Sequence, residues 1–271
     1  MQPIHIVNAF CLPEQRYSGN PAAVVPLQAW LDDATLQAIA QQNQLSETAY
    51  TVPIRDGFEL RWFTPAAEVP LCGHATLAAA HVLFNTGQTG SVIRFKTQRG
   101  WLQAIRNDDQ ITITLPVVNT EPCAADIAIK QAFGEVTVLR GNYLYIVTEA
   151  QQVIHFKLDR SWVSQTWVSR ICQQYNVPAV ALTADAVSGT TVEADVMLRV
   201  FAPLIDIDED PVTGSALAAL IPYWSQQLNQ SQLTAWQASA RGGLAKCKHQ
   251  ADTQSVTLQG HVMDYLQGHL V

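Results

Sequence analysis

The feature that most constrains the fold of this chain is an internal repeat. The pattern Arg-x-Phe-x-Pro at 61–65 recurs at 199–203, an offset of 138 residues. Further along, Arg-Gly-x-Leu at 99–102 recurs at 241–244, and Thr-Leu at 114–115 recurs at 257–258. The offset therefore rises only from 138 to 143 along the chain. Both copies have the same expected order: a strand, an acidic turn, a helix rich in alanine and leucine, an Arg-Gly strand and a hairpin.

The repeat predicts an α+β fold with two similar halves, residues 1–116 and 117–271. Each half should wrap short, mostly antiparallel strands around its own helix. The stretches 77–84 and 216–221 are apolar on nearly every side, as a buried helix requires. The last strand, 261–271, can stay with the second half or cross back to the first. A ligand is expected in the cleft between the halves, where binding sites commonly form.

Local patterns in the first half predict its elements. Asp32 and Asp33 open an amphipathic helix whose apolar face carries Leu36, Ile39 and Ala40. A second helix is expected over 75–84. Expected strands cover 3–10, 22–25, 59–63, 92–97, 102–106 and 111–115.

Composition excludes several classes of protein. The 271 residues include 16 Lys+Arg and 23 Asp+Glu, for a net charge of −7, and no basic stripe that would bind nucleic acid. No apolar run approaches the ~18 residues of a membrane span, and the N-terminus lacks the pattern of a signal peptide. These features indicate a soluble protein, expected in the cytoplasm.

Cysteine and glycine patterns point away from metals and nucleotides. The five cysteines form no C-x-x-C, so neither a disulfide framework nor a zinc ribbon is indicated. Cys72 and His74 form a close Cys/His pair, and no further cluster completes a metal site. The glycine-rich nucleotide loops and the G-x-S-x-G of serine hydrolases are also absent. We therefore expect no metal.

The starts of the two central helices are candidate anion-binding sites. Gly73 and His74 open the first helix, and Thr213, Gly214 and Ser215 open the second. A helix N-terminus offers unpaired N–H groups and a partial positive charge, and small residues let a ligand approach the backbone. Ordinary capping is the alternative: Asp210 would be the N-cap of the second helix, followed by Pro211 at its first position.

Two side chains could transfer protons. Glu47 follows the first helix, and burial in a cleft would raise the pKa of its carboxyl group into a useful range. A solvated turn glutamate is the alternative. His74 titrates near neutrality and could be a second acid/base group, or it could simply bond to the backbone.

The offset of 138 places Cys72 opposite Asp210. Such a pair could act on opposite faces of one carbon atom, and a thiol at a helix N-terminus would have a lowered pKa. Cys72 could equally be a small buried apolar residue.

Four motifs occur in a defined order along the chain. They are S-G-N-P-A-A-V-V at 18–25, L-S-E-T-A at 45–49, R-x-F-T-P-x-x-E-x-x-x-C-G-H-A-T at 61–76, and D-E-D-P-V-T-G-S-A at 208–216. S-A-R-G-G at 239–243 also fits. Together they resemble the motifs of the PhzF family, within the diaminopimelate-epimerase-like superfamily.

This resemblance implies a diaminopimelate-epimerase-like fold of two pseudo-symmetric lobes, each a barrel-like sheet around a central helix. It also implies a homodimer that needs no cofactor. Glu47 would be the main proton carrier, with His74, Asp210 and Ser215 lining the site. The implied reaction is the isomerisation of a small carboxylated substrate by proton transfer.

Two other functions stay open. The racemases and epimerases of the superfamily use two cysteines, one in each lobe, so Cys72 with Asp210 would be a variant of that arrangement. A non-catalytic metabolite-binding protein of the same fold is the other alternative.

Overall fold

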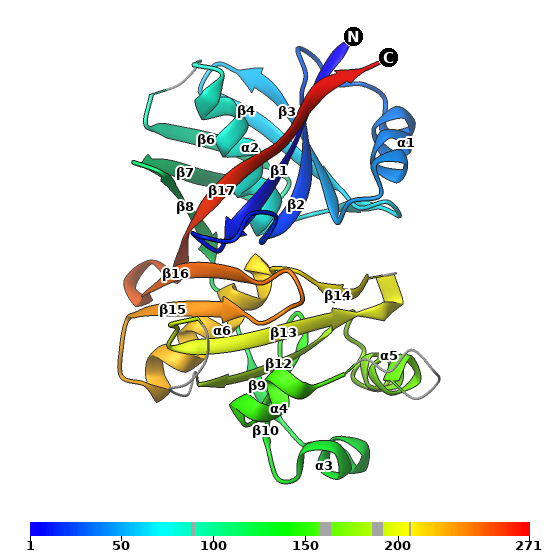
Figure 1. The fold of residues 1–271 in the computed structure, drawn as a ribbon, viewed down its shortest axis with the longest axis vertical. Coiled ribbons are helices and arrows are strands. Elements are labelled where there is room, and N and C mark those ends of the chain that lie inside the picture. Colours follow the sequence, from blue (N-terminus) through cyan, green and yellow to red (C-terminus); the bar gives the residue numbers. More distant parts are fainter. Residues whose placement is uncertain (88–89, 158–163, 186–191, 206) are drawn as a thin grey trace. The chain divides into compact units, whose positions relative to one another are not determined.

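The computed structural model describes residues 1–87, 90–157, 164–185, 192–205 and 207–271 (Figure 1). The chain divides into two compact units: Met1–Leu115 with Thr257–Val271, and Pro116–Val256. The final strand β17 (Ser255–Leu270) pairs antiparallel with β1 (Gln2–Cys11), so that Gln2 lies opposite Leu270. Residues 257–271 therefore belong to the first unit, which is the alternative in which the last strand crosses back to the first half.

The strands of the first unit form a closed ring. Around the ring, β17 pairs with β1, then β2, β3, β4, β6, β7 and β8, and β8 pairs with β17 again. The pairs β2–β3 and β4–β6 are parallel, and the other pairs with known register are antiparallel. Besides β1 and β17, the strands of the first unit are β2 (Asn20–Pro26), β3 (Glu47–Ile54), β4 (Gly57–Phe63), β5 (Glu68–Val69), β6 (Val92–Thr97), β7 (Gly100–Asn107) and β8 (Gln110–Pro116).

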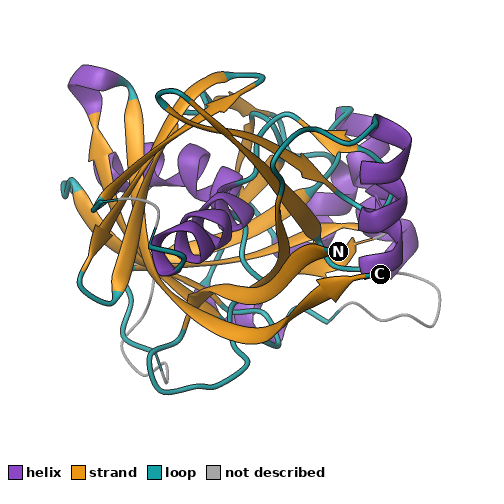
Figure 2. Ribbon diagram, turned by 90° about the horizontal axis from the view of Figure 1, so that it is seen from above, coloured by secondary structure: helices purple, strands orange, loops and turns teal. Residues whose placement is uncertain are grey.

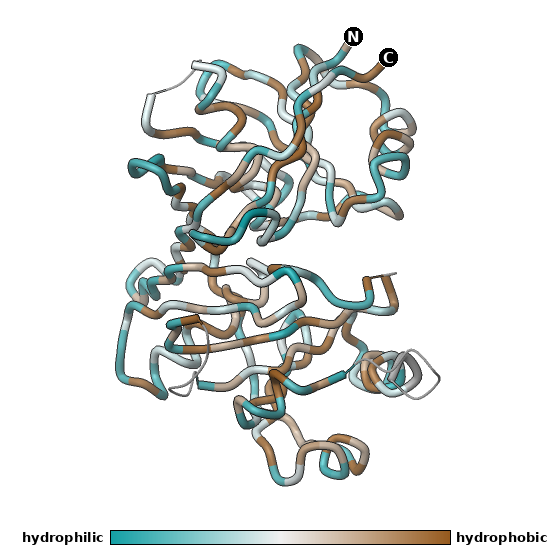
Figure 3. Tube along the Cα trace, viewed as in Figure 1, coloured by the Kyte–Doolittle hydropathy of each residue, from teal (hydrophilic) through white to brown (hydrophobic). Residues whose placement is uncertain are grey.

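Helix α2 (Gly73–Asn85) is the core of the first unit. All of its residues are buried except His81 and Asn85. Figure 2 shows strands encircling helices in this way, and Figure 3 shows apolar residues concentrated in strands and central helices. Small alanines allow the surrounding strands to approach the helix closely, which explains why this helix is apolar on every side.

Helix α1 (Asp33–Asn43) packs outside the ring. The side chain of Asp32 caps the helix by accepting a hydrogen bond from the Thr35 N–H at 2.9 Å. Leu36 and Ala40 face the core, and the buried Tyr50 hydroxyl donates to the Leu36 carbonyl at 2.7 Å. The predicted start and apolar face of this helix are confirmed.

The second unit repeats the topology of the first. The antiparallel pair β10–β11 is followed by a parallel pairing of β11 with β12, an antiparallel β12–β13 and a parallel pairing of β13 with β15. β14 pairs with β13, β16 with β15, and β9 with β10. The strands are β9 (Glu121–Cys123), β10 (Thr137–Arg140), β11 (Leu144–Val147), β12 (Val180–Asp185), β13 (Val196–Ala202), β14 (Ile207–Asp210), β15 (Gln232–Gln237) and β16 (Gly243–Gln250); the peripheral helices are α3 (Ile127–Phe133), α4 (Ala150–His155) and α5 (Ser164–Tyr175).

Helix α6 (Gly214–Gln227) is the second central helix and contains a proline. Pro222 has no N–H, so the Ala218 carbonyl one turn earlier loses its helical donor. The Val118 N–H donates to that carbonyl at 3.2 Å. The proline is therefore tolerated because the chain entering the unit supplies the missing hydrogen bond.

Each unit has an arginine–glutamate pair in the strands that precede its central helix. Arg61 donates two hydrogen bonds to Glu68, at 2.8 and 2.7 Å, and Arg199 donates two to Glu209, at 2.6 and 2.9 Å. At the offset of 138 residues Glu68 would align with Asp206, which lies outside the described residues. The acid that repeats the role of Glu68 is Glu209.

The predicted α+β class, with a central apolar helix in each unit, is confirmed. The expected strands over 59–63, 92–97, 102–106 and 111–115 lie within β4, β6, β7 and β8. Within the described part of the chain, no helix is long and apolar enough to cross a membrane.

Gly19 lies where the strands of the first ring leave no room for a side chain. Its φ is +77°, and an added Cβ would lie 2.5 Å from the Ala9 carbonyl oxygen. Gly87 has a similar φ of +70° with nothing within 4 Å of such a Cβ. We expect Gly87→Ala to cost about 1 kcal/mol of unfolding free energy through backbone strain alone. Gly19→Ala should cost a further 1–3 kcal/mol or so from the clash. Urea unfolding of both variants measures this, and equal losses would contradict the predicted clash.

Candidate functional site

Three predicted residues of the first unit converge at the start of α2. Glu47 is the first residue of β3, Cys72 is the N-cap residue of α2, and His74 lies in its first turn. One ligand atom from each lies within 4.8 Å of the others. The sequence showed only the Cys72 and His74 pair; the fold adds Glu47 to it. Cys72 and His74 are buried, whereas the Glu47 side chain is 13% exposed.

Glu47 and His74 are in direct contact. The His74 Nε2 and Glu47 Oε2 atoms lie 2.9 Å apart. Neither atom makes a well-directed hydrogen bond with any described residue, although both are buried. The contact is therefore an ion pair at close range.

The other ring nitrogen of His74 is held by a residue that the sequence did not single out. Asn20 Nδ2 lies 3.3 Å from His74 Nδ1, and the Ser46 hydroxyl donates to Asn20 Oδ1 at 3.3 Å. With the amide in this orientation, Nδ1 accepts and the proton of a neutral His74 sits on Nε2, facing Glu47. Asn20 lies inside the first motif at 18–25, which was the only available signal for its role.

Burial and charge shift the pKa values of this cluster. Burial, and then the nearby charge of Glu47, raise the pKa of the Cys72 thiol to about 11. Burial acts to lower the pKa of His74, but the negative charges of Cys72 and Glu47 close to the ring raise it well above its ordinary value. Because the thiol stays protonated near neutral pH, we assign the rise at that pH to Glu47. The lowered thiol pKa expected from the helix N-terminus is wrong, since burial outweighs the helix dipole.

The remaining predicted residues lie together at the start of α6 in the second unit. The Thr213 hydroxyl donates to Asp210 Oδ2 at 2.5 Å, and the Ser215 hydroxyl lies 2.9 Å from the Tyr143 hydroxyl. Gln237 accepts from the Thr213 N–H at 2.8 Å and donates to the Asp210 carbonyl at 2.6 Å. Tyr143 and Gln237 belong to no motif, so sequence reasoning missed them.

Both central helices lack an ordinary N-terminal cap. The N-cap residues Cys72 and Thr213 make no side-chain capping hydrogen bond, whereas Asp32 and Asp126 cap the peripheral helices α1 and α3. The alternative in which Asp210 caps the second helix is wrong, because β14 ends at Asp210 and the helix begins at Gly214. Uncapped N–H groups at the start of a long helix are suited to binding an anion.

The first residues of the two central helices also change the offset at which the two copies of the repeat align. Gly73 begins α2 and Gly214 begins α6, so C-G-H-A at 72–75 aligns with T-G-S-A at 213–216 at an offset of 141. The counterpart of Cys72 is therefore Thr213, and the expected pairing of Cys72 with Asp210 is wrong. The second unit has three more residues between its arginine strand and its central helix.

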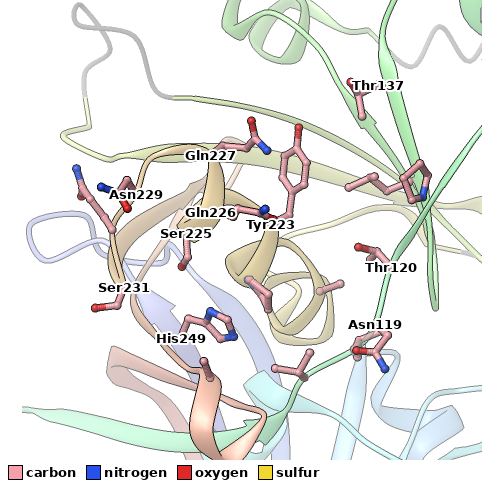
Figure 4. Close-up of a pocket in the computed structure, with 18 residues that line it drawn as sticks. Asn119, Thr120, Thr137, Tyr223, Ser225, Gln226, Gln227, Asn229, Ser231 and His249 are labelled. Carbon is pink, nitrogen blue, oxygen red and sulfur yellow. The ribbon is translucent and has the colours of Figure 1, made fainter.

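A separate pocket of about 910 Å³ lies within the second unit (Figure 4). Its walls include neutral polar side chains such as Asn119, Tyr223, Gln226 and Ser231, with His249. None of the predicted site residues lines it. The candidate site is thus defined by its chemical groups and not by this pocket.

Comparison with known proteins identifies the family. The family model described as phenazine biosynthesis-like protein, PhzC-PhzF, matches residues 7–268. The chain belongs to the PhzC/PhzF family. An uncharacterized isomerase of Pseudomonas aeruginosa is 39% identical, with 97% of this chain and 96% of the relative covered. The relatives of the PhzC/PhzF chain thus include proteins named as isomerases.

Solved structures confirm the fold of this family member. A PhzF-family protein of Enterococcus faecalis has a TM-score of 0.87 and 35% identity, with 98% of each chain covered. A hydroxyproline epimerase of Agrobacterium vitis has a TM-score of 0.68 at 12% identity, with 98% of this chain and 91% of that chain covered. The second likeness shows a shared fold alone, and it is the fold that the motif resemblance implied.

The charge of Glu47 should control the protonation of His74. In Glu47→Gln the burial of His74 remains while the carboxylate is lost, so we expect the pKa of His74 to fall below about 6.5. The wild-type ring stabilises the fold below about pH 6.5, and this contribution is lost as pH rises through its raised pKa. In Glu47→Gln the pH dependence of stability has the opposite sign, because the lowered pKa of His74 means that stability is lost as pH falls through that pKa.

An NMR titration of the histidine ring protons measures the pKa in both proteins. Glu59→Gln is the matched control, because Glu59 bonds to Trp30 and Lys96 instead. A His74 pKa that is the same in Glu47→Gln and in wild type would show that the carboxylate does not set it.

Proposed function

We propose that this protein is an isomerase that moves a proton on a small carboxylated substrate, with Glu47 as the proton carrier. The observation that carries the proposal is the Glu47–His74 contact, in which a carboxylate meets a buried imidazole at 2.9 Å. Membership of a family with relatives named as isomerases supports the same class of reaction.

Exposure distinguishes the roles of the two groups. Glu47 is 13% exposed and His74 is 4% exposed, so a substrate C–H reaches Glu47 first. His74 stands behind it, with its Nδ1 held by Asn20. A carboxylate and an imidazole in contact can hold one proton on either group, which lets Glu47 take a proton from carbon and return it at another position.

Substrate binding follows from the two uncapped helix starts. We assign the substrate carboxylate to backbone N–H groups at Gly73 or Gly214, where a partial positive charge favours an anion. Thr213 and Ser215 add hydroxyl groups, and Asp210 orients Thr213 through their hydrogen bond. A reaction without a cofactor, and a homodimer, stay predictions from the family resemblance.

Deuterium exchange tests the reaction. Small cyclic and amino carboxylates are incubated with the protein in D₂O and followed by NMR. We expect one compound to take up deuterium with wild type, and Glu47→Gln to lower the rate by about 10²–10⁴-fold. Glu59→Gln is again the control and should exchange at the wild-type rate. Full activity of Glu47→Gln would remove Glu47 as the carrier, and binding of a compound without any exchange would favour a metabolite-binding protein.

Cys72 separates this mechanism from that of a thiol-based epimerase. A thiol whose pKa is about 11 is a poor base near neutrality, and its counterpart in the repeat is Thr213. We expect Cys72→Ser to retain most of the exchange rate seen in the same D₂O assay. A loss of about 10²-fold or more would instead indicate that the thiol carries the proton.

A further inference from the structure

We propose that the pocket of the second unit binds an uncharged, polyhydroxylated small molecule such as a neutral sugar. The pocket has a volume of about 910 Å³, and none of the residues assigned to proton transfer lines it. This inference goes beyond the proposed function and does not depend on it.

The pocket lies beside the C-terminal half of α6. Its walls come from the chain that enters the second unit, from β9 and β10, from α6 and the turn after it, and from the end of β16. Its volume is within the range of about 300–1,000 Å³ that is typical of small-molecule sites, but such sites are mostly apolar. Most residues of this pocket instead carry an amide, a hydroxyl or an imidazole group. They are Asn119, Thr120, Thr137, Tyr223, Ser225, Gln226, Gln227, Asn229, Gln230, Ser231 and His249.

The polar side chains of this pocket form no hydrogen bonds with the rest of the protein. Among the described residues, none of them has a hydrogen-bond partner for its side chain, and this includes the buried hydroxyl of Ser225. Elsewhere the amides of Gln37 and Gln237 donate to backbone carbonyls. Amides and hydroxyls both donate and accept hydrogen bonds. The pocket therefore offers a dense set of donors and acceptors, which matches a ligand that carries several hydroxyl groups.

Backbone hydrogen bonds hold the walls of the pocket in place. The Gln230 N–H donates to the Ser225 carbonyl at 3.0 Å, and the His249 N–H donates to the Ser231 carbonyl at 2.9 Å. Binding therefore does not have to order these segments of the chain, which lowers its entropic cost.

Tyr223 gives the pocket a rigid aromatic surface. Its ring contacts Trp224 edge to face, with the ring centroids 5.2 Å apart, and the Trp224 indole donates to the buried Thr183 hydroxyl at 2.9 Å. Figure 4 shows Tyr223 projecting from α6 beside Gln227. A sugar ring has a face of C–H groups that can pack on an aromatic ring, and its hydroxyls point outward to polar side chains.

Charge selects the class of ligand. None of the described residues that line the pocket is Asp, Glu, Lys or Arg. A charged ligand would lose part of its hydration and meet no opposite charge, which is unfavourable. The pocket therefore favours an uncharged ligand, whereas the helix starts at Gly73 and Gly214 are suited to anions.

NMR of the side-chain amides tests the site. The protein, labelled with ¹⁵N in its asparagine and glutamine side chains, is titrated with glucose, galactose and mannose, and with the uronic acid and the amino sugar that correspond to each. We expect at least one neutral sugar to shift the amide signals of Gln226 and Gln227. The signal of Gln37, which bonds to the backbone of the first unit, should stay in place. The charged analogues of that sugar should bind at least about tenfold more weakly.

Two variants locate the sugar in the pocket. Tyr223→Ala removes the aromatic surface and should weaken binding by at least about tenfold. Tyr265→Ala is the matched control, because it removes an exposed tyrosine of the first unit and should bind as wild type does. Gln226→Ala removes one exposed amide and should weaken binding by about threefold or more. This variant decides the matter if Tyr223→Ala proves unfolded by circular dichroism.

Several results would overturn the proposal. They are the absence of amide shifts with every neutral sugar, equal or tighter binding of the charged analogues, and wild-type affinity in folded Tyr223→Ala or in Gln226→Ala. Because the titration involves no reaction and no residue of the proton-transfer site, failure here leaves the proton-transfer proposal standing, and the reverse also holds.

Discussion

Burial of one apolar helix inside a sheet is the constraint on which the rest of this structure depends. In the first unit the sheet closes on itself, so α2 meets strands on every side and must be built from alanine, leucine and other small or apolar residues. Closure also removes exposed strand edges. It requires β17 to return to β1, which ties the two ends of the chain together in one unit.

The same burial explains the chemistry at the helix start. A buried, uncapped N-terminus leaves N–H groups and a partial positive charge beside the first turn. Burial raises the pKa of Cys72 and would lower that of His74, and the carboxylate of Glu47 reverses the effect on the histidine. The proposed proton transfer rests on this arrangement, in which a carboxylate, an imidazole and a thiol are brought together in a largely buried place.

Repetition gives each unit this scaffold, but not the same chemical groups. Arg61 with Glu68 and Arg199 with Glu209 are equivalent pairs, and both central helices begin at a glycine. At the positions that carry the chemistry the copies differ, since Thr213 and Ser215 replace Cys72 and His74. The first unit therefore holds the titratable groups, and the second holds hydroxyl and amide groups linked to Asp210.

The sequence by itself determined the two-fold repeat, the α+β class, the two central helices and most strands of the first half. These follow from patterns that burial imposes on nearby residues, such as the apolar 77–84 and the Asp32 cap. Four motifs were also enough to predict the family and to select Glu47, His74, Asp210 and Ser215.

Only the tertiary structure decided which groups meet. Glu47 and His74 are 27 positions apart in the sequence, and their contact depends on how the start of β3 packs against the start of α2. The counterpart of Cys72 also required the fold, because three extra residues before α6 shift the register in a way that a gap-free offset cannot show. Asn20, Tyr143 and Gln237 were missed for the same reason: a polar side chain takes its partner from three-dimensional proximity, which no local pattern records.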